Sequence, residues 1–96
     1  MAVVSYAPQA ESDLVRLVDF LTDSDPHAAV ETAILIASAI DALQYHPLIG
    51  RPMESGFHEL VISRGRSGYI ALYRYDESRD DVLVFAIRHQ REAGYF

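Results

Sequence analysis

The 96-residue chain contains no cysteine and no lysine. Without cysteine it can form neither a disulfide framework nor a thiolate zinc site, and it has no thiol nucleophile. Its longest apolar run is only a few residues, whereas a membrane-spanning helix needs about 20. Met1 is followed by Ala2-Val3-Val4 rather than by a charged segment. We therefore expect no signal peptide, no association with a membrane and a cytoplasmic location.

Charge is distributed unevenly along the chain. The net charge is −6, and residues 1–50 hold a single basic residue, Arg16, whereas residues 51–96 hold as many arginines as acids. A domain that binds duplex DNA by neutralising phosphates normally has a basic balance, so the sequence argues against autonomous DNA binding. Guanidinium groups suit paired contacts with carboxylates or phosphates, which favours an acidic protein or RNA as the partner.

Length and composition predict one globular domain over residues 1–96, because half of the residues are hydrophobic and 23% are charged. The chain is too aliphatic to be mainly disordered. Its histidines, at positions 27, 46, 58 and 89, do not have the spacing of metal ligands. We expect no metal site and no cofactor.

Hydrophobic periodicity predicts a strand over residues 2–6 and helices over residues 8–23 and 26–45. Pro8 and Pro26 each suit a first helical turn, and Ser24 or Asp25 can cap the second helix. Asp13, Arg16 and Asp19 fall outside the predicted apolar face of the first helix, and Ile34 and Leu35 fall off that of the second. The two predicted core faces consist of Ala10, Leu14, Leu17, Val18 and Leu21, and of Val30, Ala33, Ile36, Ala37, Ile40 and Leu43.

The second half of the chain predicts a connector and a meander. Residues 46–56 hold two prolines and two glycines, which is typical of a connector. Strands are expected over residues 60–63, 69–75 and 82–87. The predicted fold class is α+β, in the order β-α-α-β-β-β, with a helix hairpin on one face of a mainly antiparallel sheet and a three-stranded antiparallel meander at the end.

Three stretches, in this order, resemble the RelE/ParE superfamily of bacterial type II toxins over nearly the whole chain. Residues 6–14, Tyr-Ala-Pro-Gln-Ala-Glu-Ser-Asp-Leu, resemble the family's strand-to-helix opening. Residues 46–52, His-Pro-Leu-Ile-Gly-Arg-Pro, resemble the exit from its second helix. Residues 69–89 resemble its closing hairpin, which ends in an arginine-histidine pair.

The resemblance implies one of two activities. ParE-like toxins inhibit DNA gyrase and are neutralised, in a toxin-antitoxin hetero-oligomer, by a ParD-like antitoxin whose C-terminal segment wraps the toxin. RelE-like toxins cleave mRNA, mostly in the ribosomal A site. The long helix hairpin and the shortage of basic catalytic groups favour the ParE-like branch, with growth arrest and plasmid stabilisation as its roles and no catalytic residues. A third alternative is an inactive toxin retained as a binding module.

The alternative to gyrase inhibition is an endoribonuclease that uses Arg88, His89 and Tyr95. Attack by a 2′-hydroxyl needs a base, an acid and positive charge at the phosphate. The three residues follow the last predicted strand closely, where RelE-like relatives carry an arginine and a terminal tyrosine or histidine. Arg64 or Arg66 would then clamp the phosphate. A histidine at a strand end, such as His89, is more often a surface or hydrogen-bonded residue than a catalyst.

Contacts to the target or antitoxin are expected at arginines of the second half and at apolar residues outside the core faces. They are Arg64, Arg66, Arg74, Arg88, Arg91, Ile34, Leu35 and Met53. Structural roles are expected for other side chains: Arg74 could also pair across the sheet with an acid, and Arg51 would anchor the connector to the acidic helices. Tyr69, Tyr73 and Tyr75 form a stripe that we expect to pack in the sheet rather than to stack on bases.

Overall fold

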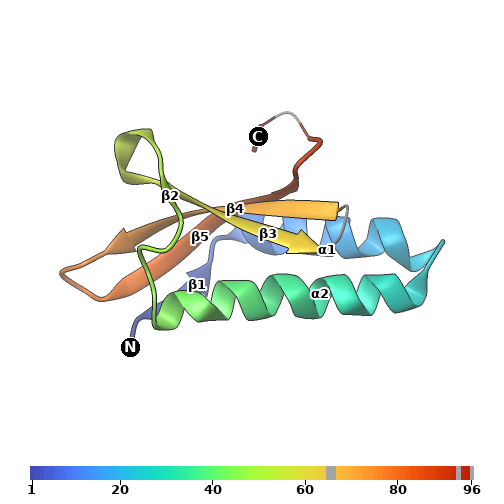
Figure 1. Ribbon diagram of the computed structural model, residues 1–96, viewed down its shortest axis with the longest axis horizontal. Helices are drawn as coiled ribbons and strands as arrows, with labels where there is room; N and C mark the ends of the chain where they lie inside the picture. The colour runs from blue at the N-terminus through green and yellow to red at the C-terminus, as the bar shows by residue number, and fades with distance from the viewer. Residues whose placement is uncertain (65–66, 93, 96) are drawn as a thin grey trace.

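The computed structural model describes residues 1–64, 67–92 and 94–95, and all of their side chains except those of residues 64 and 67. Two helices lie side by side on one face of a sheet, and the end of the C-terminal tail lies on the opposite side (Figure 1). The elements are β1 (Val3–Tyr6), α1 (Pro8–Thr22), α2 (Pro26–Asp41), η1 (Ala42–Gln44), β2 (Arg51–Pro52), η2 (Glu54–Gly56), β3 (His58–Arg64), β4 (Ser67–Asp76) and β5 (Asp81–His89).

The sheet has the order β1-β5-β4-β3-β2. β1 runs parallel to β5, and every other neighbouring pair is antiparallel. The predicted α+β class, the helix hairpin and the three-stranded meander are confirmed. β2 was not expected, because a two-residue strand that contains a proline gives no periodic signal within the connector.

The residues expected to start the two helices lie at the predicted positions. Pro8 and Pro26 occupy the first turns of α1 and α2. The Asp25 carboxylate accepts a hydrogen bond of 3.1 Å from the Ala28 N–H, which caps α2. By length and composition, residues 26–44 could also cross a membrane, with a mean hydropathy of 1.3 over a helical segment of 19 residues. Ile36, Ile40 and Leu43 of this segment are buried in the core, whereas Val30 and Ile34 are exposed.

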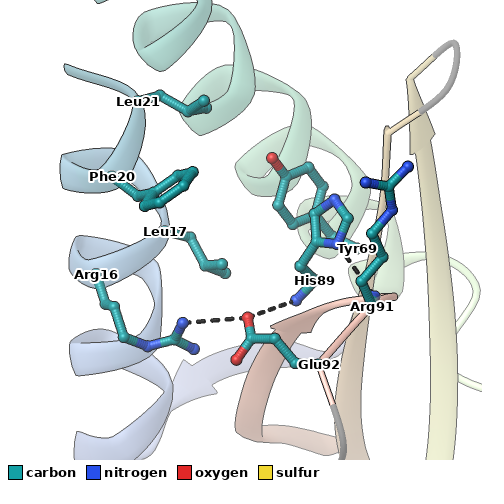
Figure 2. Close-up of a pocket in the computed structure, with 8 residues that line it drawn as sticks. All are labelled: Arg16, Leu17, Phe20, Leu21, Tyr69, His89, Arg91 and Glu92. Atoms are coloured by element: carbon teal, nitrogen blue, oxygen red, sulfur yellow. Dashed lines mark hydrogen bonds and ion pairs between the residues drawn. The ribbon is translucent and has the colours of Figure 1, made fainter. Parts of the chain in front are cut away.

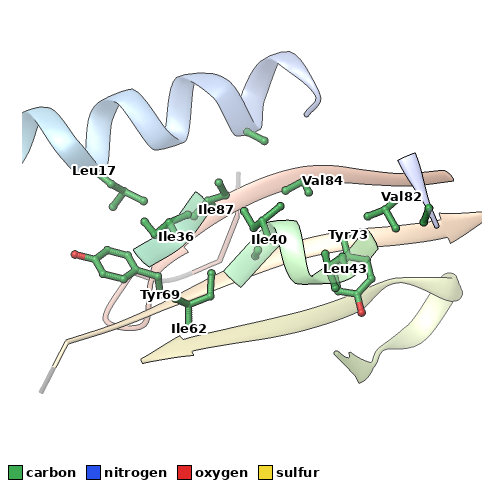
Figure 3. Packing of buried hydrophobic residues seen from close by; sticks show 13 residues of the cluster. Leu17, Ile36, Ile40, Leu43, Ile62, Tyr69, Tyr73, Val82, Val84 and Ile87 are labelled. Carbon is green, nitrogen blue, oxygen red and sulfur yellow. The ribbon is translucent and has the colours of Figure 1, made fainter. Parts of the chain in front are cut away.

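The core lies between the helix hairpin and the sheet (Figure 3). Three predictions about the helices were wrong. Val30 is 59% exposed, and Ala29 and Thr32 are buried in its place, because the buried face of α2 is rotated from the predicted one. Leu35 packs against the core rather than facing outward. Asp13 of α1 is buried, and its carboxylate is bonded to β5.

The predicted packing role of the tyrosines is confirmed for Tyr69 and Tyr73, which lie in the core. The Tyr73 hydroxyl accepts a hydrogen bond of 2.9 Å from the Gly50 N–H and so fixes the connector to β4. Burial raises the pKa of Tyr73 above its ordinary value, although the hydrogen bond from Gly50 opposes that shift. Tyr75, next to the last residue of β4, is partly buried, and its hydroxyl donates a hydrogen bond of 2.7 Å to the Asp80 carboxylate.

Candidate functional site

The sheet separates the three residues proposed above as a nuclease site. Arg88 and His89 are neighbours on β5, so their side chains lie on opposite faces. The Arg88 guanidinium lies 5.0 Å from the centre of the Tyr95 ring. The His89 ring instead contacts Tyr69, edge to face at 5.3 Å, on the side of the helices. The structure thus brings Arg88 and Tyr95 together and places His89 elsewhere.

Glu59 is the centre of the cluster on the face away from the helices. It is only 4% exposed, and its two carboxylate oxygens accept hydrogen bonds from Arg51 and from the Tyr95 hydroxyl. Burial by itself would raise the pKa of Glu59, but the hydrogen bonds from Tyr95 and Arg51 and the charge of Arg88 outweigh it and hold the pKa below its ordinary value. Glu59 is therefore an ionised structural anchor that the sequence interpretation missed.

Arg51 was expected to anchor the connector to the acidic helices, and this was wrong. It lies directly opposite Glu59 in the β2–β3 ladder and pairs with that carboxylate. The expectation failed because β2, which creates this cross-strand pair, was not predicted.

Tyr95 ties the C-terminal tail to two distant parts of the fold. Its hydroxyl donates to Glu59 on β3, and its carbonyl accepts a hydrogen bond of 2.5 Å from the Gln9 amide at the start of α1. Burial and the hydrogen bond to Glu59 raise the pKa of the Tyr95 hydroxyl well above its ordinary value. One nitrogen of Arg88 donates to the carbonyls of His89, Gln90 and Glu92, at 3.2, 3.2 and 2.7 Å. Both side chains therefore hold the tail in place.

Among the described residues, Arg74 pairs with no acid across the sheet, contrary to one of the two expectations. It donates to the Ser55 carbonyl at 2.6 Å and lies 4.3 Å from the centre of the Phe57 ring. Beside it lies a shallow groove of about 650 Å³. Met53 lies in this groove and is 42% exposed. The groove is lined by Pro52, Met53, Glu54, Phe57, Leu72 and Tyr95.

A second cleft, of about 690 Å³, opens on the helix side of the sheet, between α1 and the end of β5 (Figure 2). The Glu92 carboxylate on its rim accepts hydrogen bonds from the His89 N–H at 3.0 Å and from Arg16 at 3.1 Å. These two hydrogen bonds hold the pKa of Glu92 below its ordinary value, and the bond from the His89 N–H has the larger effect. We call this site the α1 cleft, and it is lined by Arg16, Leu17, Phe20, Leu21, Tyr69, His89, Arg91 and Glu92.

The remaining predicted contact residues are dispersed. Ile34 is 60% exposed on α2, as expected for a residue outside the core face. Arg91 is exposed at the α1 cleft. Arg66 and the side chain of Arg64, which were expected to clamp the phosphate, lie outside the described part of the chain. Within the described residues, no group of three or more acidic or histidine side chains could hold a metal ion.

A family model described as the ParE toxin of the type II toxin-antitoxin system parDE matches residues 4–94. The chain belongs to the ParE toxin family. This match confirms the predicted membership of the RelE/ParE superfamily and makes the protein a type II toxin by family.

Curated relatives of this ParE family member carry the other name of the superfamily. Toxin RelE3 of Caulobacter vibrioides is 35% identical over 92 residues, which are 96% of this chain and 98% of the relative. Toxin RelE1 of the same organism is 35% identical over 66 residues, which are 69% of this chain and 71% of the relative. These names leave the two activities of the superfamily open for this chain.

Two solved structures share the fold of this ParE family member. A chain of the chromosomal ParDE toxin-antitoxin system of P. aeruginosa aligns with a TM-score of 0.77 and 22% identity, over 93% of this chain and 96% of that one. A chain of the RelBE2 toxin-antitoxin complex of Mycobacterium tuberculosis aligns with a TM-score of 0.62 and 22% identity, over 93% and 98% of the two chains. At this identity the likeness concerns the fold alone.

Proposed function

We propose that this ParE family member acts in the cytoplasm as a non-enzymatic toxin that binds and inhibits DNA gyrase. A ParD-like antitoxin neutralises it in a toxin-antitoxin hetero-oligomer. The family match and the toxin-antitoxin systems that share its fold support the antitoxin partner. The gyrase target is the ParE-like alternative of the superfamily, and the arrangement of the candidate nuclease residues favours it.

The observation that carries the proposal is that these residues are engaged within the chain itself. The Tyr95 hydroxyl is hydrogen-bonded to Glu59, and its raised pKa makes it a poor proton-transfer group at neutral pH. One nitrogen of Arg88 donates to the carbonyls of His89, Gln90 and Glu92. His89 lies across the sheet from both. RNA cleavage would require a base, an acid and a cation on one side of the scissile phosphate.

Exposed apolar side chains supply surface for protein partners. Val30 and Ile34 are 59% and 60% exposed, one helical turn apart on α2. Met53, in the groove beside Phe57, is a third such side chain. A disordered antitoxin segment could cover these residues and fold as it binds.

The second candidate function is a RelE-like mRNA endoribonuclease, which the names of both curated relatives favour. It would use the face away from the helices, where Arg51, Arg88 and Tyr95 surround Glu59. Arg88 and Tyr95 would then have to exchange their contacts with the tail for contacts with RNA.

Substitution of the candidate catalytic groups tests the proposal. We expect cells that express the His89→Ala, Tyr95→Phe double variant without antitoxin to stop growing as they do with the wild-type chain. Folding is checked by circular dichroism. Loss of growth arrest in a folded variant would contradict the gyrase proposal and favour the nuclease. Wild-type cells that keep growing would indicate the inactive binding module.

A further inference from the structure

We propose that the α1 cleft is where the antitoxin is recognised, and that it accepts an antitoxin segment with a carboxylate next to a large apolar side chain. This inference rests on the antitoxin partner proposed above and adds the surface and the chemistry of the contact.

One wall of the α1 cleft is an apolar surface that no described element of the chain covers. Leu17, Phe20 and Leu21 project from α1 toward the rings of Tyr69 and His89 (Figure 2). Leu17 and Tyr69 are buried in the core, but Phe20 is 82% exposed, the largest exposed fraction among the large hydrophobic side chains described. Covering such a ring contributes strongly to association, because aromatic anchors dominate protein interfaces.

The opposite rim carries hydrogen-bond donors that no described residue of the chain uses. His89 Nδ1 accepts a hydrogen bond of 3.1 Å from the Arg91 N–H, so the neutral ring carries its proton on Nε2. Neither this Nε2–H nor the Arg91 guanidinium has a hydrogen-bond partner among the residues that the structure describes. The Glu92 carboxylate accepts from Arg16 and from the His89 backbone instead, through the same oxygen. The unused donors of this rim suit an acceptor supplied by a partner, and the charge of the Arg91 guanidinium favours a carboxylate.

The charge around the cleft selects a single carboxylate over a polyanion. Asp19 on α1 and Asp23 directly after it are exposed close in sequence to Phe20 and Leu21 of the cleft wall, and residues 1–50 carry the whole net charge of −6. A chain of phosphates laid along this helix would meet that acidic surface and be repelled. A protein segment can place one carboxylate at Arg91 and an uncharged ring against Phe20, which satisfies both walls.

A matched pair of small probes tests the chemistry of the cleft on the full-length protein. N-acetyl-L-tryptophan and N-acetyl-L-tryptophanamide present the same ring with and without a carboxylate. We expect both to shift the NMR signals of Phe20 and His89, with the acid binding about tenfold more tightly because its charge-assisted hydrogen bonds are lost in the amide. Arg91→Gln should abolish this difference, whereas Arg79→Gln, at the far hairpin, should preserve it. Equal affinities in the wild-type chain would overturn the proposal.

A competition experiment tests whether the occupant is the antitoxin. When the toxin is saturated with its purified antitoxin, N-acetyl-L-tryptophan should no longer shift the signals of Phe20 and His89. Phe20→Ala should weaken antitoxin binding by about tenfold or more, as expected for an interface anchor, while Val15→Ala on the same helix changes it little. A probe that binds the complex as well as the free toxin would overturn the assignment to the antitoxin. Neither readout depends on gyrase, so failure of the gyrase proposal remains distinguishable.

Discussion

The Asp13 carboxylate on α1 accepts a hydrogen bond of 2.9 Å from the backbone N–H of Ile87 on β5. β1 ends at Tyr6, opposite Val84, so β5 continues beyond it without a neighbouring strand on that edge. Glu92 acts in the same way two residues further on, where it accepts from the His89 N–H. Two acidic side chains thus replace the missing strand and satisfy donors that would otherwise be unpaired.

We expect Asp13→Ala to lower the free energy of unfolding by about 1–3 kcal/mol, because it leaves the buried Ile87 N–H without an acceptor. Asp13→Asn keeps a carbonyl oxygen at the same place and should cost less. Urea denaturation of both variants provides the measurement. If alanine and asparagine cost the same, the hydrogen bond is not what makes Asp13 stabilising.

The contact between Tyr95 and Glu59 should stabilise both the tail and the sheet. Tyr95→Phe removes the donor to one oxygen of a buried carboxylate but keeps the ring beneath Arg88, and we expect a loss of about 1–2 kcal/mol. Hydrogen exchange should quicken at the tail amides, including that of Glu92. Tyr45→Phe is the control, because Tyr45 is 69% exposed. Unchanged exchange in the tail of Tyr95→Phe would contradict the proposed anchoring role.

Gly50 is required by a close approach rather than by its backbone angles. A Cβ atom at this position would lie 2.7 Å from Cε1 and from the hydroxyl oxygen of Tyr73, and 2.8 Å from the backbone carbonyl oxygen of Glu59. Since the carbonyl belongs to the β3 backbone, it cannot move aside cheaply. We expect Gly50→Ala to destabilise the protein by about 1–3 kcal/mol in urea denaturation. A Gly50→Ala variant as stable as the wild type would show that the connector can shift away from β4.

The lowered pKa values of Glu59 and Glu92 make stability depend on pH in acid. Each group binds its proton less tightly in the folded than in the unfolded chain. Their contribution is therefore complete above the ordinary glutamate pKa of about 4.3 and is lost as the pH falls through and below it. Urea midpoints between pH 7 and pH 3 should decline, and Glu59→Gln should flatten the decline. A urea midpoint that stayed constant or rose toward pH 3 would contradict the lowered pKa values of Glu59 and Glu92.

The elements that could be predicted from the sequence carry their signals locally. Pro8, Asp25 and Pro26 mark helix starts within one turn, and the strands of the meander are long enough to show their pattern. Asp13 could not be placed in this way, because a carboxylate beside an apolar stripe is normally solvated and its acceptor role depends on β5, 74 residues away. The same applies to Glu59, whose partners come from β2 and the tail.

The separation of Arg88 from His89 did have a signal in the sequence. Adjacent residues on a strand face opposite sides of a sheet, but the last strand was expected to end at residue 87, and β5 extends to His89. A strand end placed two residues later would have split the proposed catalytic group. Boundaries are decided by pairing with β4, where Tyr69 lies opposite His89, and this pairing has no local signal.

The most direct test of the central claim is a gyrase supercoiling and DNA-cleavage assay with purified, antitoxin-free protein, run beside a ribosome-dependent mRNA cleavage assay. We expect loss of supercoiling or accumulation of cleaved DNA while the mRNA stays intact. Cleaved mRNA with unaffected gyrase would contradict the account and would make Arg88 and Tyr95, on the face away from the helices, the first residues to substitute.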